Sequence, residues 1–476
     1  MNILFALAEA YPFVKAGGLG DVGGSLPAAL NRAGADVRVI LPKYKSIPAD
    51  LLKDSRVIAT VTTHLSWRTI TFKVEMVLQG GVTYYLIDHP PYFHRDGLYG
   101  YVDDGERFAF YSKAVLDTLP HLDFRPEILH CHDWHAALIP LYLKESYGES
   151  PHHQGMRSIL TIHNLRHQGY LKGYAFGDLL GFGNQQRSAY SKLSMDGELN
   201  VLKGGLLSAD LITTVSPTYG EEIKTPYYGE RLDGILRYRD ADLYGILNGI
   251  DTEAFNPQTD PALPVPYRTS LEKKAQNKIA FQEAFGLPLR KEVLMVSIIS
   301  RLVDQKGLDL VAGIMEELLT LDLQLVVLGT GDPRYEGMFR YHQERHPDKV
   351  RALIQFDESL AHRLYAATDL LLMPSQFEPC GLSQMISMRY GTLPLVRETG
   401  GLKDSVHPYN RYTGEGNGFG FLNYNAHELL FTLKDALALH RENPSTWKAL
   451  VRQAQKTDFS WKISAERYLE LYGKLI

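Results

Sequence analysis

The sequence predicts an α/β protein that is built on two doubly wound parallel sheets. Short apolar runs alternate with longer amphipathic stretches, and this alternation occurs in two successive series. A segment rich in proline and asparagine, residues 247–267, separates the two series and has the composition of a linker. Alternation of this kind is typical of parallel strands with helices on both faces of the sheet. A length of 476 residues accommodates two such domains.

The apolar runs give the expected strands in order. The first series lies at residues 3–8, 36–41, 82–88, 127–132, 158–163 and 211–216. The second series lies at residues 293–300, 323–329, 351–356, 370–375 and 393–398. We therefore expect an N-terminal domain over residues 1–245, a second domain over 246–457, and an amphipathic C-terminal segment over 458–476.

Composition indicates a soluble globular protein whose partners are small or neutral molecules. Apolar residues make up 45% and charged residues 22%, and a net charge of −5 gives no reason to expect nucleic acid or a membrane as partner. The only two cysteines, Cys131 and Cys380, favour a reducing compartment over a disulfide framework. The first residues include Glu9 and no basic leader, and no apolar run reaches the length of a membrane helix. We expect a cytoplasmic location.

Cations and glycines follow the strands of the second series. Arg301 comes just after one strand and Lys306 lies in the loop before the next helix. The following strand runs into Gly329, Gly331 and Asp332, a turn in which the backbone can lie close to a ligand. Ligands of open parallel sheets bind at the carboxyl ends of the strands. Each residue taken alone is better explained by ordinary capping or surface charge, but their coincidence on successive strand ends predicts an anion site.

The segment MPSQFEPCGLS, residues 373–383, adds a third strand end to this set. It places Glu378 and Cys380 directly before the expected start of a helix. Free N–H groups and the helix dipole favour an anion there, Gly381 permits close approach, and Ser383 can donate a hydroxyl. The combination predicts a phosphate or diphosphate site.

A glycine-rich segment at residues 8–30 contains Gly18, Gly20 and Gly23 at the G-x-G-x-x-G spacing of dinucleotide-binding oxidoreductases. That reading fits poorly, because the residues YPFVKAG separate the glycines from the strand. The next strand also ends without the acid that would hold a ribose. We favour a flexible loop that carries Lys15 toward an anion, and a glycine turn that only eases packing is the alternative.

Two motifs suggest metal chemistry, and we interpret neither as a metal site. In HCHDWH, residues 130–135, alternation along a strand places His130 and His132 on one face, and no second ligand cluster at zinc-like spacing follows. Asp240 and Asp242 have D-x-D spacing but precede their strand, which favours a solvated charge run. His163 lies at a strand end, where it can meet a ligand or serve as a rim residue.

The tract at residues 90–112 is dense in aromatic side chains, on which sugar rings stack well. Core packing explains most of these residues. We hypothesise that part of the tract, including Tyr99 and Tyr101, borders a site for a sugar acceptor.

Seven ordered blocks along nearly the whole chain resemble the bacterial glycogen synthases and plant starch synthases. The blocks are KAGGLGDV (15–22), HCHDWH, TIHN, VSPTY, LNGID, SRLVDQKGLD and FEPCGLSQ. The resemblance implies a GT-B glycosyltransferase with two Rossmann-like domains around a deep cleft and a C-terminal helix that crosses back to the first domain. It implies transfer of glucose from ADP-glucose to the non-reducing end of an α-1,4-glucan such as glycogen, with retention of configuration and without metal or pyridoxal phosphate.

The resemblance also assigns roles to individual residues. Arg301 and Lys306 match the diphosphate-binding cations, Gly18, Leu382 and Ser383 match phosphate contacts, and Lys15 matches an active-site lysine. The residues that match the surroundings of the donor glucose are Glu378, His163 and Asn248, with Cys380 as a packing and sugar-side residue. Asp133 and Asp21 match acids that line the cleft, with Asp21 on the acceptor side. The catalytic set is thus Glu378, Lys306, Arg301, His163, Lys15 and Asp133, and Gly329, Phe356 and Gly381 join the donor set.

Two positions depart from the pattern of this family. Some relatives place a tyrosine against the adenine where this chain has Phe356, which retains stacking and loses a hydroxyl. Related retaining enzymes carry a second glutamate where Ile386 stands, so a two-carboxylate scheme is in doubt. Front-side displacement and a covalent intermediate both stay open, as do UDP-glucose as donor and the oligomeric state. Phosphorylase-like, hydrolytic and purely glucan-binding proteins are the rival classes.

Overall fold

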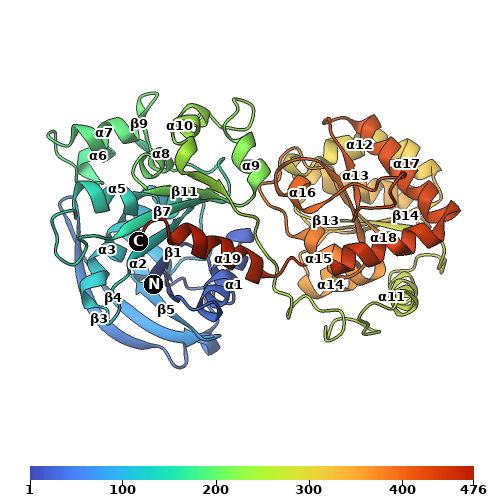
Figure 1. Cartoon of the computed structure of the whole chain (residues 1–476), viewed down its shortest axis with the longest axis horizontal. Coiled ribbons are helices and arrows are strands. Elements are labelled where there is room, and N and C mark those ends of the chain that lie inside the picture. Colours follow the sequence, from blue (N-terminus) through green and yellow to red (C-terminus); the bar gives the residue numbers. More distant parts are fainter. The chain divides into compact units, whose positions relative to one another are not determined.

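The computed structural model describes residues 1–476 and divides into two compact units. The first unit consists of Met1–Asn248 together with Trp461–Ile476, and the second of Gly249–Ser460. Both chain ends belong to the first unit (Figure 1). The boundaries expected from the sequence lie after residues 245 and 457. No helix in the chain is long and apolar enough to span a bilayer.

A nine-stranded sheet forms the centre of the first unit. In spatial order its strands are β12 (Leu243–Gly245), β11 (Leu211–Thr214), β7 (Arg157–Ile162), β6 (Ile128–His132), β1 (Asn2–Ala6), β2 (Asp36–Pro42), β5 (Val82–Asp88), β4 (Arg68–Gln79) and β3 (Arg56–Leu65). The strands from β12 to β5 are parallel. All six strands expected in this half of the sequence are present, and each is largely buried.

The edge of this sheet differs from the expected parallel arrangement. β4 pairs antiparallel with both β3 and β5, so the sheet is mixed. Sequence reasoning missed these two strands because β3 exposes alternate residues and is rich in threonine. An antiparallel strand with one solvated face lacks the continuous apolar run that marks a buried parallel strand.

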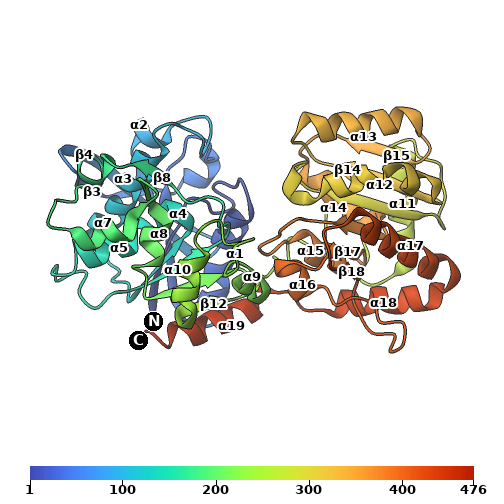
Figure 2. The same ribbon diagram turned by 90° about the horizontal axis from the view of Figure 1, so that it is seen from above.

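Helices cover both faces of the first sheet (Figure 2). α1 (Gly18–Arg32) packs against α19 (Trp461–Tyr472), while α3 (Asp104–Thr118), α5 (Leu138–Glu145) and α8 (Val201–Leu206) pack in succession. The remaining helices of this unit are short: α2 (Pro90–Phe93), α4 (Asp133–Ala136), α6 (Ala175–Asp178), α7 (Arg187–Leu193), α9 (Pro217–Glu222) and α10 (Asp233–Tyr238). A small antiparallel sheet contains β8 (Tyr170–Lys172), β10 (Glu198–Asn200) and β9 (Ser194–Met195).

The last helix, α19, is fixed on the first unit by buried aromatic residues. Trp461, Tyr468 and Tyr472 are all buried. The Tyr472 hydroxyl lies 2.7 Å from Nδ1 of His130, which is in the middle of the central strand β6. This contact ties the end of the chain to the sheet beneath the carboxyl ends of its strands.

The second unit is a doubly wound α/β fold with a wholly parallel sheet. Its strands, in spatial order, are β15 (Val350–Leu353), β14 (Leu323–Leu328), β13 (Leu294–Ile299), β16 (Leu370–Met373), β17 (Leu393–Arg397) and β18 (Phe419–Phe421). Its helices are α11 (Leu271–Ala284), α12 (Leu308–Thr320), α13 (Pro333–Arg345), α14 (Glu358–Ala367), α15 (Ser383–Arg389), α16 (Gly400–Ser405), α17 (Ala426–Glu442) and α18 (Pro444–Lys456). α12 packs with α17, and α11 packs with α14. The expected fold class of two doubly wound α/β units is confirmed.

Candidate active site

Three neighbouring strands of the second unit end at the residues that the sequence predicted for a diphosphate. β14, β13 and β16 are adjacent, and Gly329, Arg301 and Glu378 follow their carboxyl ends. The guanidinium of Arg301 is exposed and makes no hydrogen bond or ion pair within the chain. A cation that has no partner in the protein is available to an anionic ligand.

Lys306 and Glu378 form a partly buried ion pair. Nζ of Lys306 lies 2.6 Å from Oε2 of Glu378, and the Ser375 hydroxyl donates to the same oxygen at 3.1 Å. The two charged side chains are 18% and 8% exposed, so solvent screens the pair weakly. Lys306 therefore fixes the position of the Glu378 carboxylate beside the candidate site.

Glycines allow the segments that carry Lys306 and Glu378 to lie close together. Gly307 has a φ of +69°, and a Cβ at this position would lie 1.9 Å from the carbonyl oxygen of Pro374. Only glycine lets the Lys306 loop approach the Pro374–Glu378 segment this closely. On the other side, the N–H of Gly401 donates to the Glu378 carbonyl at 3.1 Å. A Cβ on Gly400 would lie 2.0 Å from that same carbonyl oxygen.

The other predicted donor residues of this unit lie around the same strand ends. α15 begins at Ser383, and no side chain caps its first N–H groups. Gly381 has a φ of +71°, and Gly329 has a φ of +154° with no room for a Cβ beside the Ser300 carbonyl. Cys380 is buried and forms no disulfide, which suits a packing role, and Phe356 is 88% exposed in the loop after β15. A side chain so exposed is free to stack on a planar ligand.

The first unit places a second group of predicted residues at three adjacent strands, β1, β6 and β7. The glycine-rich segment follows β1, and Nζ of Lys15 pairs with Oδ1 of Asp21 at 2.7 Å. Gly18 is the first residue of α1, and a Cβ on Gly20 would meet the Lys15 side chain at 2.9 Å. The ammonium group of Lys15 is thus held above the start of the helix by an acid in its first turn.

Glu9 organises this loop, and sequence reasoning missed its role. Its carboxylate is buried, and Oε2 accepts the backbone N–H groups of Ala16 at 2.6 Å and Gly17 at 3.0 Å. The Tyr99 hydroxyl donates to Oε1 at 2.8 Å. A carboxylate that directly follows an apolar strand and precedes a glycine-rich loop was the available signal. The sequence does not reveal this role, because the partners of the Glu9 carboxylate are mainly backbone N–H groups, which every residue except proline has.

Glu9→Gln is expected to loosen the glycine-rich loop. The amide keeps one acceptor oxygen in place of two, and a charge-assisted hydrogen bond is worth about 1.5–3 kcal/mol. Trypsin should therefore cleave after Lys15 about tenfold faster, as measured by mass spectrometry of timed digests. Glu149→Gln changes an exposed glutamate elsewhere in this unit and is the matched control. Equal cleavage rates in the two variants would contradict the role of Glu9.

Asp133 lies at the end of β6 in a strained, buried position. Its φ is +54°, in the left-handed region that few residues other than glycine adopt. Oδ1 accepts the backbone N–H groups of His163 at 2.7 Å and Asn164 at 3.4 Å, which links β6 to the end of β7. Burial raises the pKa of Asp133 to about 7, and the two N–H donors oppose this shift.

The raised pKa of Asp133 predicts a dependence of stability on pH. Between about pH 4 and 7 the unfolded chain has released this proton while the folded chain still holds it. The free energy of unfolding therefore falls as pH rises through this range, by up to about 1.4 kcal/mol per pH unit. Asp133→Asn lacks this contribution and tolerates the same backbone conformation. Urea unfolding of both proteins at pH 5 and pH 7.5 should show the variant gaining relative stability, whereas a constant difference would contradict the raised pKa.

His163 and Asn248 are the remaining predicted residues of this unit near a donor glucose. His163 follows β7, is half-buried, and has its pKa lowered to about 3 by burial, so its ring is neutral at physiological pH. The carboxamide oxygen of Asn248 is buried and has no hydrogen-bond partner in the chain. A ligand hydroxyl would satisfy that oxygen.

Tyr99 and Tyr101, the predicted acceptor-side residues, both make contacts within the first unit. Besides its bond to Glu9, Tyr99 stacks on His135 with 4.6 Å between ring centroids. The Tyr101 hydroxyl accepts the N–H of Gly97 at 2.9 Å, and the guanidinium groups of Arg95 and Arg107 lie about its ring. These contacts give both tyrosines a structural role, which leaves their proposed contact with an acceptor as a prediction.

The motifs that resembled metal sites are engaged in other contacts. The rings of His130 and His132 stack at 4.3 Å, which confirms that they share a face of the strand. Asp240 pairs with Lys224 and Asp242 with Arg239, as expected of a surface charge run. No group of three or more His, Cys, Asp or Glu side chains is arranged to hold a metal ion.

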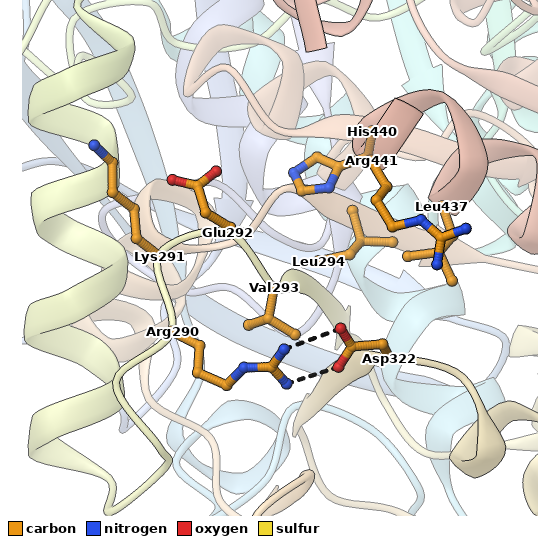
Figure 3. A pocket seen from close by; sticks show the side chains of 9 residues that line it. All are labelled: Arg290, Lys291, Glu292, Val293, Leu294, Asp322, Leu437, His440 and Arg441. Carbon is orange, nitrogen blue, oxygen red and sulfur yellow. Dashed lines mark hydrogen bonds and ion pairs between the residues drawn. The ribbon is translucent and has the colours of Figure 1, made fainter. Parts of the chain in front are cut away.

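A pocket of about 370 Å³ opens at the opposite end of the second sheet (Figure 3). It lies beside Leu294, where β13 begins, and the end of α17. Arg290 and Asp322 form a two-bond ion pair across it at 2.7 and 2.9 Å. Ligands of parallel sheets bind at the carboxyl ends of the strands, so this pocket is distinct from the candidate site.

Comparison with known proteins finds relatives along the whole chain. Residues 2–238 match the family described as the starch synthase catalytic domain, and residues 281–456 match glycosyl transferases group 1. Glycogen synthase from Desulforamulus reducens is 48% identical over 100% of this chain and 99% of its own length. Glycogen synthase from Geobacillus stearothermophilus is 49% identical over 100% and 98%.

Solved structures of related proteins have the same fold. The catalytic domain of starch synthase IV from Arabidopsis thaliana, bound to ADP and acarbose, superposes with a TM-score of 0.91 at 35% identity. The match covers 100% of this chain and 99% of that one. Sucrose-phosphate synthase from Thermosynechococcus elongatus shares the fold, with a TM-score of 0.61 at 19% identity.

Proposed function

The chain belongs to the family of bacterial glycogen synthases and plant starch synthases, which are GT-B glycosyltransferases. We propose that it transfers glucose from ADP-glucose to the non-reducing end of an α-1,4-glucan. The configuration at the anomeric carbon is retained and ADP is released. The observation that carries this proposal is the set of Arg301, Lys306 and Glu378 at neighbouring strand ends of the second unit.

The two cations suit the leaving group of this reaction. A diphosphate needs no strong protonation to leave, but negative charge accumulates on it as the glycosidic bond breaks. Arg301 and Lys306 can stabilise that charge together with the first N–H groups of α15. Because these groups supply the positive charge, we propose that the transfer uses neither a metal ion nor pyridoxal phosphate.

The sugar requires the opposite kind of environment. An oxocarbenium-like centre must be oriented and kept from water. Glu378, which Lys306 holds at the boundary of the diphosphate site, is suited to bind glucose hydroxyls, and we assign the same task to His163 and Asn248. Lys15, Gly18, Asp21 and Asp133 complete the polar set of the first unit. Both cysteines are buried and neither forms a disulfide, which supports a cytoplasmic location for this chemistry.

Incubation with ADP-glucose or UDP-glucose in the presence of glycogen tests the proposal. We expect rapid release of ADP, slower release of UDP, and new linkages that an α-1,4-specific amylase removes. Glu378→Gln is the matched variant, and its turnover should fall far more than its affinity for ADP-glucose. Absence of nucleoside diphosphate release with both donors would contradict the proposed function, and faster release from UDP-glucose would contradict the proposed donor.

A further inference from the structure

His132 and His163 form a hydrogen-bonded pair at the ends of two adjacent strands. His132 is the last residue of β6, and His163 directly follows β7. Nδ1 of His132 lies 2.9 Å from Nε2 of His163. Burial lowers the pKa of both rings far below the physiological range, so both are neutral. One ring must therefore donate a proton in this bond and the other must accept it.

The two remaining ring nitrogens lie in different surroundings. Nε2 of His132 is buried and has no hydrogen-bond partner. The rings of Phe5 and His130 lie against this side chain, and both nitrogens of His130 are already engaged by Tyr472 and Thr161. Nδ1 of His163 makes no hydrogen bond within the chain, but this ring is only half-buried. A ligand can therefore reach His163 and cannot reach His132.

Two arrangements of the protons are possible. If His163 donated from Nε2, the proton of His132 would sit on its buried Nε2, where no acceptor is present. If His132 donates from Nδ1, its buried Nε2 carries only a lone pair. Buried N–H groups without an acceptor are rarer in proteins than buried acceptors without a donor. The second arrangement is the more stable.

We propose that His132 is a positioning residue that fixes His163 as the tautomer protonated on Nδ1. In this state His163 presents an N–H group to a ligand at the end of β7. It donates a hydrogen bond to a ligand oxygen and has no free lone pair there with which to act as a general base. That this ligand is the sugar of the nucleotide donor rests on the proposed function, whereas the tautomer follows from the contacts of the two rings.

Neutron diffraction from crystals of the whole chain, exchanged into deuterium oxide at neutral pH, tests the tautomer directly. We expect deuterium on Nδ1 of both His132 and His163 and none on Nε2 of either ring. Deuterium on Nε2 of His163 would overturn the proposal. This measurement needs no substrate. It therefore tests the tautomer of His163 independently of whether the protein releases ADP from ADP-glucose.

Two substitutions of similar size test the consequence for turnover. His132→Asn can place an amide N–H group where Nδ1 stands, whereas His132→Asp offers only acceptor oxygens there and forces the proton of His163 onto Nε2. We expect kcat of the aspartate variant to be at least about tenfold below that of the asparagine variant, which corresponds to the loss of one hydrogen bond to a ligand. In the background of His163→Asn this difference should vanish. An equal loss in both variants would show that His132 acts through packing alone and would overturn the proposal.

Discussion

Lys306→Met is expected to lower kcat at least a hundredfold and to destabilise the protein by about 3–5 kcal/mol. The first effect follows from loss of a cation at the proposed diphosphate site. The second arises because Glu378 becomes a buried carboxylate whose one remaining side-chain partner is Ser375. Initial rates of ADP release and urea unfolding of the free protein measure the two effects separately.

A double-mutant cycle separates the ion pair from catalysis. Glu378→Gln removes the buried charge, so Lys306→Met combined with Glu378→Gln should regain much of the stability that the lysine variant loses. The combined variant should stay as inactive as Lys306→Met, because the cation is still missing. A Lys306→Met variant with the stability of the wild type would contradict a stabilising ion pair between Lys306 and Glu378.

Arg301→Met is expected to reduce kcat/KM about a hundredfold or more while the free energy of unfolding stays within about 0.5 kcal/mol of the wild type. Arg301 is exposed and has no partner in the chain, so its removal breaks no internal contact. The charge matters only once a diphosphate is present. Steady-state rates with ADP-glucose and urea unfolding without ligand measure the two quantities.

Arg340→Met is the matched control for this experiment. Arg340 is also a solvent-facing arginine of the second unit, 53% exposed on α13, and its one ion pair is with Glu336 on the same helix. Its removal should change neither rate nor stability appreciably. A rate for Arg301→Met close to that of the control would remove Arg301 from the diphosphate site.

The two cations thus differ in their contacts within the protein. Lys306 is fixed by Glu378 before any ligand arrives, and Arg301 is left free to meet one. A preorganised charge loses little freedom when charge develops on the leaving group. A mobile one can follow the donor as it binds. Both cations were predicted from sequence, but their different states depend on contacts that sequence does not display.

The strand predictions succeeded because buried parallel strands have a strong local signal. β13 and β14 are nearly continuous apolar runs flanked by turns, and their ends place Arg301 and Gly329 by simple counting. The pair β3 and β4 lacked that signal, since one face of each strand is solvated. The sheet was therefore predicted as wholly parallel when its edge is antiparallel.

The sequence by itself determined the two α/β units, the strand ends at which cations and glycines gather, and the family, because these depend on local periodicity and on ordered motifs. Only the tertiary structure decided that Lys306 pairs with a carboxylate 72 residues away, that Glu9 holds a loop through backbone groups, and that His132 contacts His163. Such contacts join residues that are distant along the chain or use backbone atoms common to all residues. Local pattern does not encode them, and they arise only when the folded strands place their ends side by side.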